Sequence, residues 1–172
     1  MRKRLISLSI GVALFAAACG GAATTAAGDS ATDAAGELAP TTPFVLFDGS
    51  TATLADYQGQ PLVANFWASW CPSCVAEMSA AFKPAQEQLG DQVAFLGLNL
   101  QDERDRALQL VEETGVLFDL GEDATGDLYV ELGGIGMPFT VFIDAEGNII
   151  REHNGPLSQQ QLIEVIQETI LP

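Results

Sequence analysis

The chain of 172 residues is long enough for one compact domain with extensions at its ends, and 48% of the residues are hydrophobic, which is enough for a core. Its 23 acidic residues outnumber the seven basic ones and give a formal net charge of −16 at pH 7. Such a chain is repelled by nucleic acids and by anionic surfaces, so nucleic-acid binding is excluded as a function.

The N-terminus has the pattern of a secretory signal peptide. Three basic residues at 2–4 precede an uncharged apolar run over 5–18, and Cys19 follows three alanines. This cysteine resembles the lipidated first residue of bacterial lipoproteins. We therefore expect residues 1–18 to be removed, which changes the net charge to −19, and Cys19 to anchor the chain to the cell membrane by a lipid. An ordinary cleaved signal and an uncleaved anchor remain alternatives, and all three place the domain outside the cytoplasm.

Residues 19–43 are mostly Ala, Thr, Gly and Asp, which predicts a flexible tether. The domain is expected over 44–172. It opens with alternating strand-like and turn-like residues, in which Asp48-Gly49 is typical of a hairpin turn. The run over 61–67 is almost continuously apolar, as in a strand that is buried on both faces of a sheet.

Strands and helices then alternate along the rest of the chain. Beyond 61–67, further strands are expected at 92–100, around 117–120, at 139–144 and at 149–154, and helices at about 72–89, 103–114, 127–132 and 158–170. Gly115 closes the second of these helices, and Ser158 and Gln161 have the spacing of a capping box before the last. This order predicts an α/β fold in which a mixed sheet is flanked by helices.

The cysteines Cys71 and Cys74 lie between a predicted strand and a predicted helix. A thiolate at a helix N-terminus is stabilised by free amide groups and by the helix dipole, and Pro72 at the first helical position costs no hydrogen bond. Cys71 is then the reactive nucleophile. Cys74, one turn further along, is placed to attack a mixed disulfide formed at Cys71. The pair therefore indicates thiol–disulfide exchange.

Other roles for the pair are not excluded by the residues. A zinc site needs four ligands, yet after Cys74 the chain offers no further cysteine and only one histidine, His153. Copper bound by the two thiolates and His153 is a further alternative. A structural disulfide would close a very small loop and would restrict the unfolded chain little. We expect neither a metal nor a cofactor, and we interpret His153 as an ordinary residue of the last strand.

Two motifs carry a resemblance to a known family. The segments NFWASWCPSC, from Asn65, and GMPFTVFIDAEGNI, about 65 residues later, resemble the thioredoxin superfamily. They are most similar to the membrane-anchored TlpA/ResA-like thiol–disulfide oxidoreductases of bacteria. The likeness runs from about Leu38 to the C-terminus. It implies a thioredoxin-like fold with an N-terminal β-hairpin and a central αβ insert between Leu100 and Gly133.

The resemblance also implies roles for single residues. The family's cis-proline, which faces the cysteine pair, falls on Pro138. A glutamate three residues after the second cysteine falls on Glu77, where it shifts the thiol pKa values or accepts a proton; a solvated helix residue is the alternative. Asn65 replaces the buried aspartate of cytoplasmic thioredoxins. The residues expected to face the substrate are Trp70, Pro72, Ser73 and Met137, and Trp67 and Trp70 are expected to pack around the cysteines.

One position departs from the family. Its kink-forming proline, five residues after the second cysteine, is replaced by Ser79, and Pro84 follows later, so the helix is expected to bend elsewhere.

The implied partners are exported proteins with thiols or disulfides and an integral membrane redox protein. Reduction of apocytochrome c cysteines and oxidation of secreted proteins are both open, and Pro72 favours oxidation slightly. A peroxide-reducing enzyme and a non-catalytic or metal-binding lipoprotein are alternatives from other classes.

Overall fold

The computed structural model describes residues 36–171, and the predicted signal peptide and Cys19 lie outside them. A seven-stranded mixed sheet in the order β2-β1-β5-β4-β3-β6-β7 runs through this part of the chain. Its strands are β1 (Phe44–Leu46), β2 (Thr51–Ala52), β3 (Leu62–Trp67), β4 (Ala94–Leu100), β5 (Asp119–Asp123), β6 (Phe139–Ile143) and β7 (Ile149–Asn154). The expected α/β fold with a mixed sheet and an N-terminal hairpin is confirmed.

Strand β3 lies inside the sheet, between β4 and β6, and all six of its residues are buried. It pairs with β4 in parallel and with β6 antiparallel, and Asn65 is the register partner of Gly97 on one side and of Thr140 on the other. A strand with covered faces and edges needs the continuous apolar run that the sequence has there. The end of β3 and the start of β6 therefore lie side by side.

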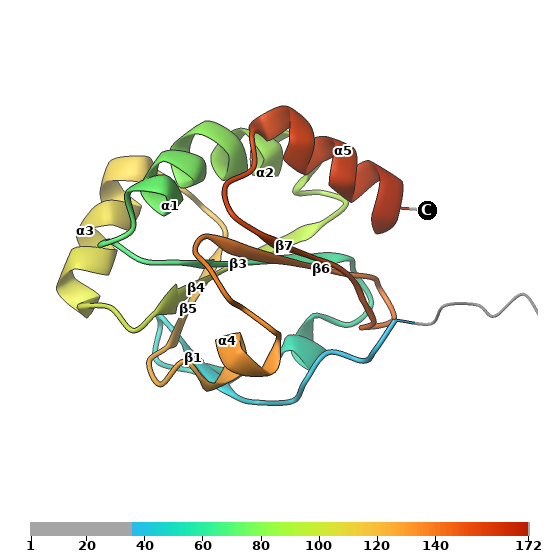
Figure 1. Cartoon of the computed structure of the whole chain (residues 1–172), viewed down its shortest axis with the longest axis horizontal. Helices are drawn as coiled ribbons and strands as arrows, with labels where there is room; N and C mark the ends of the chain where they lie inside the picture. Colours follow the sequence, from blue (N-terminus) through green and yellow to red (C-terminus); the bar gives the residue numbers. More distant parts are fainter. Residues whose placement is uncertain (1–35, 172) are drawn as a thin grey trace, which may run out of the picture. The chain divides into compact units, whose positions relative to one another are not determined.

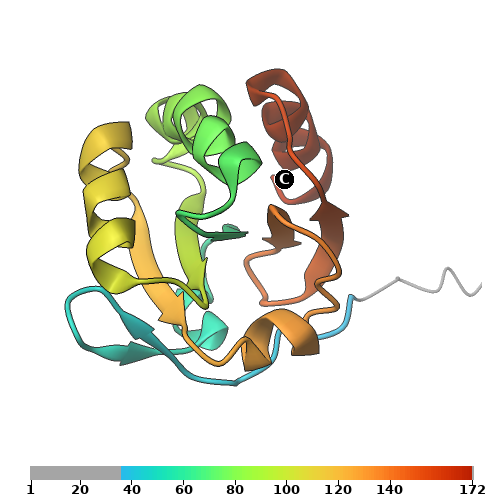
Figure 2. The same cartoon turned by 60° about the vertical axis from the view of Figure 1, so that its left-hand side comes forward.

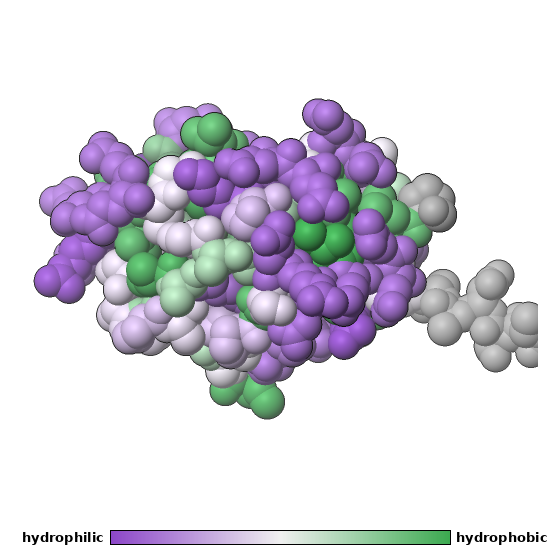
Figure 3. Space-filling view, turned by 90° about the horizontal axis from the view of Figure 1, so that it is seen from above, coloured by the Kyte–Doolittle hydropathy of each residue, from purple (hydrophilic) through white to green (hydrophobic). Residues whose placement is uncertain are grey.

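Helices cover both faces of the sheet, unequally (Figures 1 and 2). On one face lie α1 (Pro72–Glu77), α2 (Lys83–Leu89), α3 (Arg104–Thr114) and α5 (Gln159–Thr169). The other face carries the short α4 (Asp127–Glu131) and a single 3₁₀ turn, Leu54–Tyr57. Figure 3 looks onto the helical face, where hydrophilic side chains predominate and hydrophobic ones form small separate groups. Among residues 36–171, no helix combines the length and the apolar character needed to cross a bilayer.

The helix expected over 72–89 is interrupted by one wide turn. Residues Met78–Phe82 are π-helical, and the Lys83 amide bonds to the carbonyl of Met78, five residues back. Pro84 follows immediately. A proline has no N–H to donate, and its ring clashes with the carbonyl of the residue four positions earlier, so a wider turn there relieves the clash. The wide turn includes Ser79 and ends two residues before Pro84, so this geometry does not confirm the prediction that the helix bends elsewhere than at Ser79.

Two boundaries differ from those expected. Strand β5 begins at Asp119 rather than near Leu117, which is 86% exposed, because pairing with β4 and β1 rather than apolar character defines this polar strand. Part of the segment expected as a tether is hydrogen-bonded to the chain around the start of β7. The Ile149 amide donates to Glu37 O (2.7 Å), and the Ala39 amide donates to Gly147 O (2.9 Å). The folded part of the chain therefore begins before Phe44.

Candidate active site

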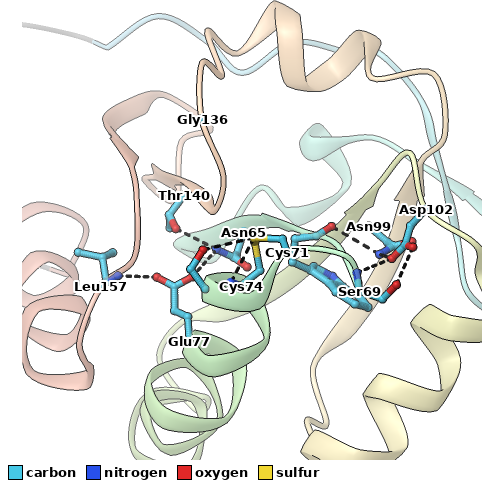
Figure 4. Close-up of a disulfide and its surroundings, with 12 residues drawn as sticks. Asn65, Ser69, Cys71, Cys74, Glu77, Asn99, Asp102, Gly136, Thr140 and Leu157 are labelled. Carbon is cyan, nitrogen blue, oxygen red and sulfur yellow. Dashed lines mark hydrogen bonds between the residues drawn. A yellow bond between two sulfur atoms is a disulfide. The ribbon is translucent and has the colours of Figure 1, made fainter.

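The two cysteines lie at the start of α1 and are joined by a disulfide (Figure 4). Cys71 is the N-cap residue, and its Sγ accepts a hydrogen bond from the Cys74 amide at 3.3 Å. Cys71 is 5% exposed and Cys74 is completely buried. A helix amide therefore points at the sulfur of Cys71, and Cys71 is the cysteine that an incoming thiolate reaches first.

The surroundings of the pair are apolar. Trp67, Ala68, Met78, Ala107, Leu110 and Val116 form a buried cluster with the two cysteines, and Met137 packs against it. Trp67 is fully buried, as expected, whereas Trp70 is 55% exposed and its Nε1 donates to Gln101 O at 3.2 Å. Trp70 thus flanks the site at the surface. Ser73 Oγ lies 3.4 Å from Cys71 Sγ, and Pro72 is exposed.

The second wall of the site is the loop that enters β6, where the Met137–Pro138 peptide bond is cis. This loop is held in place by polar contacts. Asn154 Oδ1 accepts hydrogen bonds from the amides of Ile135 and Gly136, both at 3.1 Å, and Tyr129 OH donates to Gly136 O at 3.2 Å. Ile135 itself is 88% exposed. Figure 4 shows the chain at Gly136 above the cysteine pair.

Glu77 is not a solvated helix residue, since it is only 3% exposed. Its Oε1 accepts the Leu157 amide at 2.6 Å, and its Oε2 accepts Asn65 Nδ2 at 3.3 Å. Burial raises the pKa of Glu77 from 4.5 to about 7, and the hydrogen bonds from Leu157 and Asn65 oppose part of that rise. A carboxyl that gains and loses its proton near neutral pH therefore lies one helical turn beyond Cys74.

The polar network behind the cysteines includes two residues that the sequence did not single out, Thr140 and Leu157. Asn65 Nδ2 donates to Thr140 Oγ1 at 3.0 Å as well as to Glu77, and Thr140 is fully buried. Asn65 and Thr140 are each a polar residue within an otherwise apolar strand, and this pattern could have indicated that the two side chains bond to each other. His153 is the register partner of Thr140 on β7, and burial, together with Arg151, lowers its pKa.

A second group of polar contacts, also missed, surrounds Asp102 on the other side of the cysteines. Its carboxylate accepts hydrogen bonds from the Ser69 amide (2.5 Å) and from Ser69 Oγ (2.7 Å), two residues before Cys71. Asn99 Nδ2 donates both to Asp102 (3.0 Å) and to Trp67 O (3.5 Å). The segment between β3 and α1 is thereby attached to the segment between β4 and α3.

The chain is similar in sequence and in fold to known proteins of thiol–disulfide exchange. The chain matches the model of the Redoxin family over residues 26–166. It is 36% identical over 117 residues to the thiol:disulfide interchange protein DsbE of Vibrio cholerae, and equally to that of Escherichia coli. Each match covers 67% of this chain but only 59% and 58% of those relatives. The solved structure of MTB dsbF, in its mixed oxidized and reduced forms, matches with a TM-score of 0.68 and 25% identity, over 74% of this chain and 94% of dsbF.

Proposed function

This chain belongs to the Redoxin family, and we propose that it is a thiol–disulfide oxidoreductase of the TlpA/ResA-like type that exchanges disulfides with exported proteins outside the cytoplasm. The observation that carries the proposal is the Cys71–Cys74 pair at the N-terminus of α1, with the less buried sulfur facing a helix amide. The names of the DsbE relatives support the same chemistry.

In the reducing direction, the thiolate of Cys71 attacks one sulfur of a target disulfide. The bond between Cys71 and the target forms as the target's S–S bond breaks, and the released target thiolate takes up a proton. Cys74 then loses its proton and attacks Cys71 Sγ, which forms the Cys71–Cys74 disulfide and releases the second target thiol. Two electrons have passed to the target, and two thiols of another protein, oxidised to a disulfide in turn, must return them. The oxidising direction is the reverse of these steps.

Glu77 is the group that takes the proton of Cys74 in this scheme. A base works best when its pKa lies near the operating pH, and the pKa of about 7 meets that condition. Glu77 and Cys74 lie at i and i+3 on one helix, so their side chains share a face. The Leu157 amide and Asn65 hold the carboxylate in one orientation.

We assign the reducing direction to the pair. The buried carboxylate of Glu77 lies one turn from Cys74 and repels a negative charge on the cysteine thiolates. The reduced form of the pair is then less stable, and a less stable reduced form is a stronger reductant. The dipole at the start of α1 acts the other way and amounts to about half a charge; Glu77, with a pKa of about 7, carries a full charge that exceeds it only above neutral pH. Disulfides in exported proteins, such as those in apocytochrome c before haem attachment, are then the substrates.

The partners follow from this assignment. An integral membrane redox protein supplies the electrons, and a lipid on Cys19 keeps the domain at the membrane. The signal-like segment over 1–18 supports this location. Mass spectrometry of the protein isolated from the membrane fraction tests the lipid directly.

The reduction potential of the Cys71–Cys74 pair tests the function and its direction. The protein is equilibrated against glutathione and dithiothreitol buffers, and the fraction of disulfide is measured. A potential below about −250 mV agrees with a reductant, and one between about −180 and −120 mV assigns the oxidising direction instead. A pair that does not exchange with either buffer refutes the function.

A further inference from the structure

The loop that leads from β3 into the cysteine pair is held by hydrogen bonds to the carboxylate of Asp102. Ser69 gives two hydrogen bonds to the Asp102 carboxylate, one from its amide at 2.5 Å and one from its hydroxyl at 2.7 Å. The Cys71 amide donates to Ala68 O at 3.1 Å, so residues 68–71 form a tight turn. Asp102 therefore holds the middle of the turn whose last residue is the reactive cysteine (Figure 4).

Asp102 is itself firmly placed. Asn99 Nδ2 donates to it at 3.0 Å and the Glu103 amide at 2.8 Å, in addition to the two bonds from Ser69. Partial burial raises the pKa of Asp102, but these four hydrogen bonds outweigh that effect and lower it overall. The carboxylate is charged in the neutral pH range, and hydrogen bonds to a charged acceptor are about twice as strong as neutral ones.

A second contact joins the same two loops. Trp70 Nε1 donates to the carbonyl of Gln101, which has a φ of 45° although it is not a glycine. Such a conformation is unfavourable for most residues and persists where the surroundings enforce it. Here the Gln101 amide donates to Asp123 O at 3.3 Å, and Gln101 Nε2 donates to Thr125 O at 2.7 Å. The strained residue presents its carbonyl to Trp70.

We propose that Asp102 is a positioning residue for the reaction at Cys71: through Ser69 it holds the turn before the cysteine, so that the Cys71 sulfur stays at the N-terminus of α1 after the disulfide is reduced. The inference rests on the proposed function. In the oxidised protein the S–S bond itself ties Cys71 to the helix. Reduction breaks this bond, and the contacts of Asp102 then keep the sulfur in front of the helix amides that stabilise its thiolate.

Positioning and simple electrostatics predict opposite results when Asp102 is removed. A nearby negative charge disfavours a thiolate, so an electrostatic role predicts more Cys71 thiolate in Asp102→Ala. If Asp102 acts by position, the freed turn lets the sulfur leave the helix N-terminus, and the thiolate becomes less stable. The charge effect is small because the carboxylate is partly exposed and already bonded to four donors, so we expect the positional effect to prevail.

The test measures the pH dependence of alkylation at Cys71 in the reduced full chain, with the modified residue identified by peptide mass spectrometry so that Cys19 and Cys74 do not contribute. Asp102→Ala should lower the Cys71 thiolate fraction at neutral pH about tenfold. Ser69→Ala, which keeps the backbone hydrogen bond, should cause a smaller decrease. Asp105→Ala, which removes an exposed acid from the first turn of α3, should leave the fraction unchanged.

An unchanged or larger thiolate fraction in Asp102→Ala overturns the inference, even if that variant melts at a lower temperature. Should Asp102→Ala fail to fold, Ser69→Ala decides, and a thiolate fraction equal to or above that of the wild type overturns the inference. Exchange of the wild-type pair with glutathione is scored separately. A wild type that does not exchange refutes the proposed function, whereas an exchanging wild type with an unaffected Asp102→Ala refutes only the positioning role.

Discussion

Glu77 and Leu157 are 80 positions apart in the chain, yet the amide of Leu157 donates to Glu77 Oε1 at 2.6 Å. Leu157 lies in the connection between β7 and α5, so a backbone group of a distant element fixes the buried acid next to the cysteines. The position of the carboxylate therefore does not depend on another side chain alone. It is built into the way α5 packs beside the turn Met78–Phe82 and α2, which continue the helix from α1.

Glu77→Gln should flatten the pH dependence of stability. The pKa of Glu77 in the folded protein lies above its ordinary value, so the folded state binds more protons between pH 4.5 and about 7. The associated stabilisation is fully present below pH 4.5 and is lost as the pH rises through 7; its size is about 3 kcal/mol. Urea unfolding at several pH values measures the free energy of unfolding as a function of pH. Relative to wild type, the variant should gain stability as the pH rises, and Glu87→Gln, at an exposed site on α2, should show the wild-type profile.

Parallel stability profiles of Glu77→Gln and wild type between pH 5 and 8 would contradict the raised pKa. The same variant also tests the assigned direction. Without the buried carboxylate the Cys71–Cys74 dithiol is more stable, so the reduction potential should become less negative.

Cys74→Ser should stop the reaction after its first step. Cys71 still attacks a disulfide, but no second thiol is present to release the product, so a mixed disulfide accumulates. Mass spectrometry after incubation of the reduced variant with oxidised glutathione should show one glutathione on Cys71. Cys71→Ser should show no adduct at Cys74, which is completely buried. Exchange that continues at the wild-type rate in Cys74→Ser would refute the assigned roles.

Asn154→Ala should slow exchange with protein substrates without unfolding the domain. Its Oδ1 orients the amides of Ile135 and Gly136 just before the cis-proline, in an exposed loop. We expect a loss of about 1 kcal/mol, or about fivefold in the rate with a protein substrate. Asn154→Asp keeps the oxygen acceptor and should retain most of the rate. Equal rates for wild type and Asn154→Ala would mean that this loop does not contribute to the reaction.

Gly97→Ala should destabilise the fold through close contacts beneath the site. A Cβ at this position meets Leu120 Cδ2 at 2.9 Å and Trp67 Nε1 at 3.0 Å. Overpacking of this kind costs about 1–3 kcal/mol, which urea unfolding detects. Gly136→Ala is the matched control, because a Cβ there has no neighbour within 4 Å. If the two variants lose the same stability, crowding around Trp67 is not the cause.

The positions of the strands and of the cysteine pair along the chain could be predicted because both depend on local patterns. The continuous apolar run of β3 and the change from strand to helix at Cys71 can each be recognised from residues that are adjacent in the sequence. The burial of Glu77 could not be derived in this way. Helical spacing placed it on the face of Cys74, but its exposure depends on the packing of α5, which is far away in sequence.

The contacts of Asp102 and Thr140 depend on the register between strands. Trp67 pairs with Asn99 in parallel, so the loops that follow β3 and β4 meet at the same edge of the sheet. This rule places Ser69 near Asp102 once the strand order is known. Likewise, Asn65 meets Thr140 only because β6 pairs with β3 in one particular register. The sequence contains these residues, but their partners are chosen by strand pairing.

The contact of residues 37–39 with the turn before β7 determines at which end of the sheet the described chain begins. Ala39 bonds to Gly147 beyond the far end of β6, whereas the cis-proline loop beside the cysteines precedes its first residue, Phe139. The five residues of β6 separate these points by about 17 Å. The chain therefore enters the fold at the end of the sheet opposite the disulfide. The first described residues therefore do not cover the end of the sheet that carries the cysteine pair.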